Sequence, residues 1–459
     1  MAHKRAEQYD VVVVGGGLAG LCAATAAAER GSRTLLLEAG PQLGGSTRTL
    51  GGVIYAAGTS VQKAAGITDG ASDLLASYLL LNQYCLEPSI VRTLAESAAA
   101  ALDWLVERGV DFPPDQLYSA APGDPGRSHR ARGRGPGLVD PLATHLRTTS
   151  ADIRTGTRAT GLDIKSGRVA GVRIGGDVVP ARVVVLATGG YGNAPDLLNR
   201  FYPTAAGLGA ALHYVGAASN RGDGITMGLA AGAQFTGADR GLLLLAPEFA
   251  TQNEPALPPE LILVNAHGHR FMAEDLPYSV APGIVAAQTG GTAWALFDER
   301  ARLSFPPRSS NSPARSWTLQ RFADAQLPPG IHRAWSLDSL SRAIGLPADA
   351  VEQTVLRYNQ LSRRGVDADW EKDAAHLLPC SQSPFYAVRV RPRVLVLTSG
   401  GLRIDTAAHV LGQAGRPIMG LFAAGETTGG VIGDRYIGGL VNTSSAVFGI
   451  RAGTLAARG

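Results

Sequence analysis

Cysteine is scarce in this chain: its 459 residues include only Cys22, Cys85 and Cys380. The three are odd in number, widely separated and in no CxxC pair, which excludes a disulfide framework, a cysteine zinc site and a disulfide reductase. No group of histidines and carboxylates has the spacing of metal ligands, so we expect no metal. Charged residues are also few, at 17%, against 45% hydrophobic residues. This balance predicts a folded protein with a large core.

Long apolar runs are absent as well. No stretch reaches the ~18 apolar residues of a membrane-spanning helix, and the polar start MAHKRAEQYD has no export-type hydrophobic region. We therefore expect no membrane span and a cytoplasmic protein. The one dense basic run, RSHRARGRG at 127–135, has no interleaved Phe, Tyr or Trp. This favours a solvated loop over a nucleic-acid site, with a loop near a cofactor or cap as a third interpretation.

The most informative stretch that is present is VVVVGGGLAG, residues 11–20. Its four valines predict a buried strand, and an Ala-rich helix begins at the glycines. Gly15 allows the tight turn, Gly17 lets the backbone approach a pyrophosphate, and Gly20 lets the helix lie close to the strand. A second strand, RTLLLE, ends at Glu38, whose carboxylate can accept both ribose hydroxyls of an adenosine. This order of elements predicts a dinucleotide-binding site.

The composition of the sequence and its predicted secondary structure change twice along the chain. Residues 1–243 contain the opening motif, helical patterns at 71–109, a Pro-, Gly- and Arg-rich loop at 110–137 and then strands. Residues 244–392 have proline clusters, short strands and one clear helix, DAVEQTVLRYNQLSRRG. Residues 393–459 return to a strand, a glycine loop and a final helix. We therefore expect an α/β fold in which a nucleotide-binding domain, formed by the first and last of these parts, is interrupted by an inserted domain.

Three later segments carry a resemblance to a known family. VVVLATGGYG (183–192) and LFAAGE (421–426) read as strands that end in glycine turns, and GGLVNTSSA (438–446) as a glycine pair before a helix. With the opening motif they resemble the FAD-binding flavoproteins of the fumarate reductase and succinate dehydrogenase superfamily, over nearly the whole chain. The resemblance implies a Rossmann-like FAD-binding domain of the glutathione-reductase type, interrupted by an α+β cap domain for the substrate. It implies FAD held by Gly15, Gly17, Gly20, Glu38, Ser46, Thr47, Gly52, Thr188, Gly189, Gly425, Glu426 and Asn442.

The resemblance also suggests how the flavin is attached and how its reduced state is stabilised. Thr47 stands where some relatives carry a histidine bound covalently to the flavin, and GGSTRTLGG offers no histidine. Non-covalent FAD is therefore expected. In the family, the N-terminus of the last helix faces the flavin, where its dipole should stabilise the reduced state.

Departures from the family pattern point to the substrate. ILVNAHGHRFMAED (262–275) resembles the cap-domain signature, but Tyr278, Leu397 and Tyr436 stand where fumarate reductases have an arginine, a histidine and an arginine. A dicarboxylate would find no bidentate partner at these positions. The two tyrosines, together with GGVIYAAGTSVQKAAG (51–66), resemble the 3-ketosteroid dehydrogenase branch of the superfamily.

This branch implies an FAD-dependent 3-ketosteroid dehydrogenase that acts on a small, apolar, steroid-like ketone. Desaturation removes a proton from the carbon α to the ketone and a hydride from the β carbon. We expect Tyr278 and Tyr436 to divide the roles of base and carbonyl donor, in either order, with Tyr118 as a weaker third candidate. Backbone N–H groups near Gly438 and Gly439 can hold the ketone oxygen. The IYAAGT stretch favours 4-ene over 1-ene formation.

Two other functions stay open. One is a fumarate-reductase-like flavin ene-reductase of another unsaturated acid or ketone, with the same hydride step and different pocket walls. The other is a flavin-binding protein without turnover, which the intact tyrosines and the cap signature disfavour. The chain has no second GxGxxG motif, which argues against a dedicated NADH site. The electron acceptor is therefore open: a quinone, a dye-like carrier or oxygen.

Overall fold

The computed structural model of this chain describes residues 8–120, 124–250, 256–306, 314–323 and 327–458, and it divides the chain into two units. The first unit is formed by Met1–Gly207, Gly216–Leu242 and Leu397–Gly459. The second is formed by Leu208–Val215 and Leu243–Val396. An inserted cap domain for the substrate with the bounds 244–392 stays a prediction.

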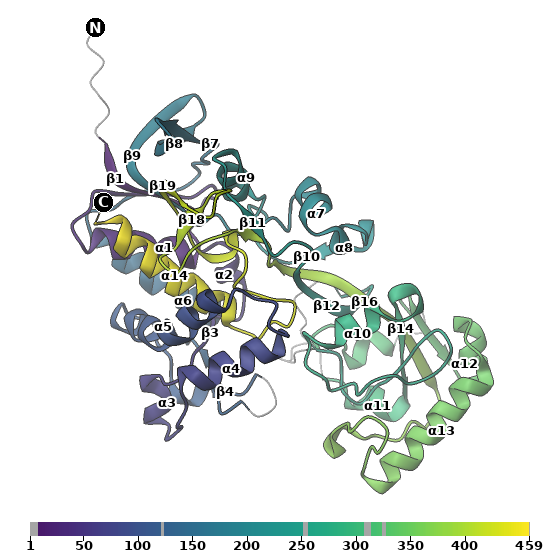
Figure 1. Cartoon of the computed structure of the whole chain (residues 1–459). Coiled ribbons are helices and arrows are strands. Elements are labelled where there is room, and N and C mark those ends of the chain that lie inside the picture. The colour runs from purple at the N-terminus through teal and green to yellow at the C-terminus, as the bar shows by residue number, and fades with distance from the viewer. Residues whose placement is uncertain (1–7, 121–123, 251–255, 307–313, 324–326, 459) are drawn as a thin grey trace. The chain divides into compact units, whose positions relative to one another are not determined.

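The first unit is built on an eight-stranded sheet with the order β18-β19-β9-β1-β2-β6, which β7 and β8 join through β9 (Figure 1). β1 pairs in parallel with β2 and β9, β19 pairs in parallel with β9, and β2 pairs in parallel with β6. Val- and Leu-rich runs form the central strands because both of their faces are buried, as is usual in parallel sheets. The bounds are β1 (Tyr9–Val14), β2 (Thr34–Leu37), β6 (Asp152–Arg154), β7 (Gly161–Lys165), β8 (Arg168–Ile174), β9 (Asp177–Leu186), β18 (His409–Leu411) and β19 (Pro417–Ala423).

Two helices from opposite ends of the chain pack against each other in this unit. Figure 1 shows α14 (Leu440–Ala456) beside α1 (Leu18–Ala28). A Cβ added to Gly449 would lie 2.5 Å from the carbonyl oxygen of Ala19, and one added to Gly453 would lie 2.1 Å from that of Ala23. The two backbones are therefore in direct contact, and this contact fixes α14 against the helix that carries the glycine motif.

Substitution of Gly453 by alanine tests this contact. The added methyl group has no room beside the backbone of α1, so the helices must move apart. We expect G453A to lower the free energy of unfolding by about 1–3 kcal/mol, the usual cost of overpacking. Chemical denaturation of G453A and of the wild type measures this difference, and equal stabilities would contradict the close packing.

The other elements of the first unit surround the sheet. β3, β5 and β4 form a three-stranded sheet in that order, and β11 pairs with β17. The helices are α2 (Gly45–Thr49), α3 (Ser60–Ala64), α4 (Ala71–Leu81), α5 (Pro88–Glu107), α6 (Arg134–Arg147), α7 (Pro195–Phe201), α8 (Pro203–Ala206) and α9 (Asp223–Ala230), with short 3-10 turns at Pro114–Gln116 and Gly425–Thr427. The strands are β3 (Val53–Tyr55), β4 (Leu117–Tyr118), β5 (Ser128–Arg130), β11 (Phe235–Thr236) and β17 (Gly401–Leu402).

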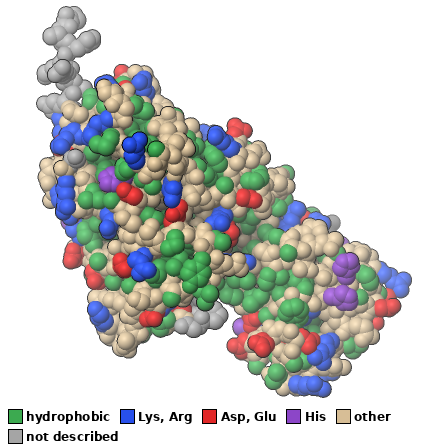
Figure 2. Space-filling view, in the orientation of Figure 1, with side chains coloured by type: hydrophobic (Ala, Val, Ile, Leu, Met, Phe, Trp, Pro, Cys, Tyr) green, Lys and Arg blue, Asp and Glu red, His purple; other side chains and the backbone are tan. Residues whose placement is uncertain are grey.

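The interpretation of the basic run as a solvated loop is wrong for its first part. Residues 128–130 form β5, His129 is 1% exposed, and Arg127 is 6% exposed. Arg127 makes a bidentate ion pair with Asp69, with both N···O distances at 2.8 Å. The positive charge of Arg127 is therefore neutralised inside the fold, because a buried guanidinium needs a paired carboxylate. Figure 2 shows blue and red side chains mixed over the visible face.

The second unit contains a six-stranded sheet in which β16 is central. β10, β12, β14 and β15 all pair with β16, and β13 pairs with β14. The strands are β10 (His213–Tyr214), β12 (Gly241–Pro247), β13 (Ile262–Val264), β14 (Ala293–Asp298), β15 (Ile331–Ala334) and β16 (Phe385–Thr398). The helices are α10 (Ala281–Ala286), α11 (Glu299–Ser304), α12 (Leu337–Ile344) and α13 (Ala348–Arg364), with 3-10 turns at Gly209–Ala211, Thr289–Gly291, Leu319–Phe322 and Ala374–His376.

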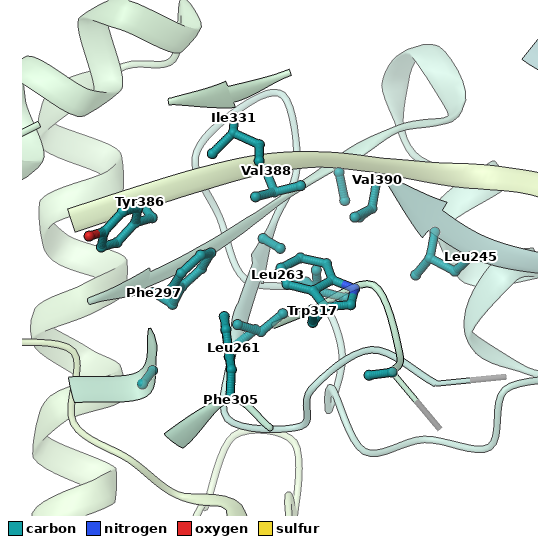
Figure 3. Close-up of a cluster of buried hydrophobic side chains, with 14 of the residues drawn as sticks. Leu245, Leu261, Leu263, Phe297, Phe305, Trp317, Ile331, Tyr386, Val388 and Val390 are labelled. Carbon is teal, nitrogen blue, oxygen red and sulfur yellow. The ribbon is translucent and has the colours of Figure 1, made fainter. Parts of the chain in front are cut away.

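Alternation along these strands gives the second unit two apolar clusters. Ile262 and Leu296 pack with residues of α12 and α13, such as Leu340 and Val355. The residues that alternate with Ile262 along β13 and with Leu296 along β14 belong to the other cluster, because successive side chains of a strand point to opposite faces of the sheet. Figure 3 shows this second cluster, with Tyr386, Val388 and Val390 along β16 and the rings of Phe297 and Trp317 beside them.

Candidate functional site

Glycine- and acid-bearing turns follow the carboxyl ends of the parallel strands in the first unit. These turns are residues 15–20 after β1, Glu38 after β2, Thr188 and Gly189 after β9, and residues 425–426 after β19. Because the strands are parallel neighbours, the turns lie along one edge of the sheet. The chain order reverses between β1 and β9, and such a switch point is where open α/β sheets bind their ligands.

The glycines at the start of α1 have different structural reasons. A Cβ on Gly20 would lie 1.7 Å from the carbonyl oxygen of Gly15, and one on Gly15 would lie 2.1 Å from that of Ala187. The fold itself therefore requires both glycines. Gly17 has ordinary dihedral angles, φ −72° and ψ −176°. A Cβ there would meet only the carbonyl oxygen of Gly44, at 4.0 Å, so the packing of the described chain leaves room for a side chain at this position.

Gly17 is the N-cap of α1, and among the residues that the structure describes no side chain caps this helix end. The first N–H groups of a helix have no intrahelical partners and carry partial positive charge. A side chain at position 17 would stand beside these groups, whereas glycine keeps the space open for an anion such as a pyrophosphate. The residues present at this edge therefore fit a dinucleotide.

Glu38 is 7% exposed, and its two carboxylate oxygens each accept a backbone hydrogen bond. Oε2 accepts from the N–H of Gly16 at 2.7 Å, and Oε1 accepts from the N–H of Gly40 at 2.6 Å. Each carboxylate oxygen has a second lone pair. Glu38 is thus oriented at the end of β2 and still has acceptor capacity for the two ribose hydroxyls that the sequence predicts.

Ser46, Thr47 and Asn442 tie α2 to the rest of the edge. The Oγ of Ser46 accepts from the N–H of Ala217 at 2.9 Å. The hydroxyl of Thr47 donates to Oδ1 of Asn442 at 3.3 Å, and Nδ2 of Asn442 donates to the carbonyl oxygen of Val53 at 3.0 Å. The position where some relatives carry a flavin-linked histidine thus holds a hydrogen-bonded threonine. Non-covalent attachment stays a prediction.

Two of the predicted cofactor glycines have packing reasons of their own. A Cβ on Gly52 would lie 2.1 Å from the carbonyl carbon of Arg134 at the start of α6. A Cβ on Gly425 would lie 2.9 Å from the Cβ of Ala19 in α1. Both glycines therefore bring the edge segments close to the helices that surround the site, and this packing accounts for them without any direct contact to a cofactor.

Asn220 is a site residue that the sequence patterns did not mark. It is 4% exposed, and its Nδ2 donates to Oγ of Ser46 at 3.1 Å and lies 3.5 Å from Oε2 of Glu426. A Cβ on Gly189 would lie 2.5 Å from Oδ1 of Asn220, so the amide packs directly on the turn after β9. A lone asparagine in the loop SNRGDG has no motif spacing, and only the three-dimensional structure places it at this edge.

Glu426 is surrounded by hydrogen-bond donors rather than by cations. Its Oε1 accepts from the N–H and from the hydroxyl of Thr398, at 2.9 and 3.0 Å. Burial raises the pKa of Glu426 to about 7, against the opposing effect of the hydrogen bonds from Thr398 and from the N–H of Gly190. Beside it, Oγ1 of Thr188 accepts from the N–H of Gly224 at 3.0 Å, which orients the turn after β9.

The raised pKa of Glu426 has a consequence for stability. Between the ordinary range of a glutamate and about pH 7, the folded chain keeps this proton and the unfolded chain loses it, so stability falls as pH rises through this window. We expect E426Q, which stays neutral, to gain up to about 3 kcal/mol relative to the wild type between about pH 5 and about pH 8. Urea unfolding at both pH values measures the gap, and a gap that is independent of pH would contradict the assignment.

Tyr436 lies just before α14, is 8% exposed, and accepts a hydrogen bond on its hydroxyl oxygen from the N–H of Gly439 at 3.0 Å. Burial raises the pKa of Tyr436 to about 12, although the N–H groups of Gly439 and Val441 favour the phenolate. Nearby Tyr118 and Glu426 oppose ionisation further. The phenol therefore stays neutral at ordinary pH, and because its oxygen accepts from the backbone, its own proton can be donated elsewhere.

This hydrogen bond bears on the predicted oxyanion contacts. The N–H of Gly439 already donates to Tyr436, so this group and the phenol act as one unit rather than as two independent donors. Gly438 is half-buried beside them. Tyr118 lies on β4 with the guanidinium of Arg130 4.7 Å above its ring, and its effect on the pKa of Tyr436 places the two phenols in one neighbourhood. The structure thus brings together two of the three predicted tyrosines.

Tyr55 holds the strand β3 against α14 and was not selected as a site residue from the sequence. Its backbone N–H donates to Oγ1 of Thr443, and this hydroxyl donates to the carbonyl oxygen of Tyr55, both at 2.9 Å. Its phenol forms side-chain hydrogen bonds with Arg127 and Asp124. The buried pair of Arg127 and Asp69 therefore stands behind the segment that contacts the start of α14.

Tyr278, the third predicted tyrosine, belongs to the second unit and lines a cavity of about 370 Å³ there. Most of the wall is apolar, with side chains such as Leu257, Met272 and Phe305. Its ionisable side chains, among the residues that the structure describes, are Glu260, Glu274, Asp275, Tyr278 and His376. The described lining thus contains neither lysine nor arginine.

Glu274 faces this cavity but is neutralised from behind. Arg270 makes a bidentate ion pair with Glu274, both distances being 2.9 Å, and also contacts Asp367 at 2.7 Å. Nζ of Lys372 lies 3.0 Å from Glu274. All four side chains are at most 6% exposed. The acid of the cap signature is thus part of a buried, balanced network, which holds β13 to the segment after α13.

Within the ranges that the structure describes, no group of His, Cys, Asp and Glu side chains could hold a metal ion. His267 and His269 of the cap signature are exposed. None of the described helices is both long enough and apolar enough to cross a bilayer.

Comparison with known proteins gives a consistent picture. The family model FAD_binding_2, described as "FAD binding domain", matches residues 10–439. The vinyl phenol reductase of Lactiplantibacillus plantarum is 30% identical over 95% of this chain and 93% of its own length. A fumarate reductase (cytochrome) of Shewanella frigidimarina is 31% identical over 98% of this chain and 77% of its own length.

Among solved structures, the 3-ketosteroid-Δ4-(5α)-dehydrogenase of Rhodococcus jostii RHA1, in complex with 4-androstene-3,17-dione, superimposes with a TM-score of 0.83. It shares 27% of its sequence with this chain, and the alignment covers 99% of each. The predicted FAD-binding fold of mixed α/β character is therefore confirmed, and so is FAD as the cofactor.

Proposed function

Because this chain belongs to the FAD_binding_2 family, we propose that it desaturates a neutral, apolar ketone of the 3-ketosteroid class, with 4-ene formation favoured. It is an FAD-dependent oxidoreductase, and relatives of this family act on CH–CH bonds. The finer choice of substrate rests on the cavity around Tyr278.

The charges of that cavity favour a neutral substrate. A dicarboxylate such as fumarate needs guanidinium or ammonium partners to replace its water shell. The described lining offers Glu260 and Asp275 as acids, the neutralised Glu274, and His376 as its one basic group. An anion would therefore be repelled, whereas an apolar ring system with few polar groups fits a wall of Leu, Met, Phe and Pro.

Two phenols have different environments and so suit different roles. Bound FAD supplies the acceptor for the substrate hydride. Tyr436, whose pKa is about 12 and whose oxygen accepts from Gly439, suits a neutral donor to the ketone oxygen. The role of base then falls to the other phenol, Tyr278, which lines the cavity of the second unit.

A second candidate is an ene-reductase that runs the same hydride step toward the saturated product. The names of two relatives, a vinyl phenol reductase and a fumarate reductase, support reduction of a carbon–carbon double bond. Vinyl phenol carries no carboxylate, so this relative agrees with a neutral substrate. The superposition with the Δ4-(5α)-dehydrogenase supports the ketone and the position of the double bond.

A substrate panel separates these candidates. The FAD-loaded protein is assayed with saturated 3-ketosteroids plus an artificial electron acceptor, and with fumarate or 4-vinylphenol plus reduced dye. We expect kcat/KM for a 3-ketosteroid to exceed that for fumarate by about 10³ or more, the size of discrimination that unpaired buried charge imposes. A higher value for fumarate would contradict the proposal, and a higher value for 4-vinylphenol would favour the neutral ene-reductase.

A further inference from the structure

His376 and Asp275 form a hydrogen-bonded pair in the wall of the cavity that Tyr278 also lines. Nδ1 of His376 lies 3.2 Å from Oδ2 of Asp275, which also accepts the backbone N–H of Asp373 at 2.8 Å. The same oxygen is thus fixed from two sides. Hydrogen bonds from Asp373 and His376 hold the pKa of Asp275 below its usual range despite burial, so this carboxylate is ionised.

The orientation of the ring follows from this contact. An ionised carboxylate only accepts hydrogen bonds, so Nδ1 of His376 carries a proton and donates it to Asp275. Nε2 is then the ring atom that can take up another proton. A carboxylate that fixes the tautomer of an imidazole, which in turn serves a hydroxyl, is the arrangement that activates weak nucleophiles and bases in many enzymes.

A tyrosine needs such help, because a phenol with an ordinary pKa of about 10 is almost wholly protonated at neutral pH. We propose that the Asp275–His376 pair removes the phenol proton of Tyr278, directly or through one water in the cavity, and so makes it a base. His376 is a positioning residue that acts through Tyr278. The inference rests on the proposed role of Tyr278 in proton transfer.

The step balances in protons and electrons. Nε2 of His376 accepts the phenol proton, and the phenolate oxygen of Tyr278 takes the proton from the carbon α to the ketone. Bound FAD would be the acceptor of the two electrons that leave the β carbon as hydride. The imidazolium, stabilised by Asp275, then releases its proton to water, since the His376 side chain is 37% exposed. In the reductive direction the same groups supply the proton in reverse order.

The surrounding charges permit this relay. The other titratable groups of the cavity wall are Glu260 and Glu274. Glu274 is ion-paired with Arg270 and Lys372, which lie behind it. Asp373 lies next to the pair and caps the 3-10 turn Ala374–His376 by accepting from the N–H of Ala375 at 2.8 Å. The carboxylates that flank the pair are therefore Glu260, Glu274 and Asp373, of which Glu274 is ion-paired with Arg270 and Lys372.

The test uses the FAD-loaded protein and whichever panel substrate the wild type turns over fastest. H376N keeps a side-chain N–H for Asp275 but cannot take up a proton. We expect kcat to fall by about 10²–10⁴-fold, the usual contribution of a proton-transfer group, with KM changed by less than about threefold. H269A, at an exposed histidine outside the cavity wall, is the matched control and should behave as the wild type.

Two readouts distinguish proton transfer from a structural role. Wild-type kcat should fall as the pH is lowered, because a protonated imidazole cannot accept the phenol proton, and H376N should lose this inflection. Added imidazole should restore part of the activity of H376A. D275N, which leaves the histidine in place, should lower kcat less than H376N does.

Failure of the His376 relay can be distinguished from failure of the proposed substrate. Retained kcat in H376N, or loss without a change in pH profile and without rescue by imidazole, would overturn the relay whatever the substrate. A wild type that reduces an unsaturated acid and no ketone contradicts the steroid proposal, while the relay is still judged on that acid. A wild type that turns over no panel member contradicts both.

Discussion

Replacing Tyr436 by phenylalanine is expected to lower kcat by about 10²–10³-fold, the usual cost of one donor to a developing oxyanion. The reason is local: the phenol oxygen accepts from the N–H of Gly439, and the phenol proton is the group that can be given to the ketone. FAD content should be unchanged, because phenylalanine fills the same buried space. The pKa of about 12 adds a pH prediction, since the donor stays protonated and no alkaline loss of activity below about pH 11 should come from it.

Y278F is expected to cost about 10²–10⁴-fold in kcat through loss of the base, and the double variant should be inactive with FAD still bound. Y84F is the matched control, because Tyr84 is 63% exposed in the first unit. Steady-state kinetics and flavin absorbance of the four proteins measure these effects. Activity within tenfold of the wild type in the double variant would end the assignment of both tyrosines.

The second large effect is expected at the glycine motif, where two neighbouring glycines should behave differently. G17A should fold as stably as the wild type without added FAD, because a Cβ at this position meets one atom at 4.0 Å. Its affinity for FAD should fall by about 100-fold or more, since the methyl group occupies the place of the pyrophosphate. G20A should be less stable than the wild type even without FAD, because its Cβ would lie 1.7 Å from a carbonyl oxygen.

Two measurements separate these cases: thermal unfolding without added FAD, and flavin-fluorescence titration of the FAD-depleted proteins. Release of FAD by acid precipitation of the wild type checks the predicted non-covalent attachment at the same time. G17A protein that binds FAD as tightly as the wild type would show that the space beside the start of α1 is not the pyrophosphate site.

The parts of the fold that the sequence predicts well are those with local signals. Residues 11–20 and Glu38 form one β-α-β unit, in which each element follows from periodicity and glycine placement over a short stretch. The final helix likewise appears at Leu440–Ala456, after the glycine pair. Short strands are different: Val53–Tyr55 and Ser128–Arg130 pair across more than seventy residues, and three residues carry too little periodicity to reveal a strand.

The same distinction applies to the site. Buried polar contacts such as Arg127 with Asp69, or Asn220 with Ser46, join segments that no motif connects. Sequence patterns therefore predict a solvated arginine-rich run and do not indicate Asn220. The pairing of His376 with Asp275 also joins residues 101 positions apart. Sequence patterns identify residue types that suit a chemistry, whereas the partner that tunes each of them depends on the tertiary structure.

If the bound flavin oxidises a saturated 3-ketosteroid, an anaerobic experiment without any other electron acceptor will show it. The yellow protein is mixed with a saturated 3-ketosteroid without oxygen or dye, the flavin absorbance is followed, and the steroid is extracted. We expect bleaching of the flavin with formation of one equivalent of the 4-ene-3-ketone. A flavin that stays oxidised with such ketones, but is reoxidised after chemical reduction by fumarate, would contradict it.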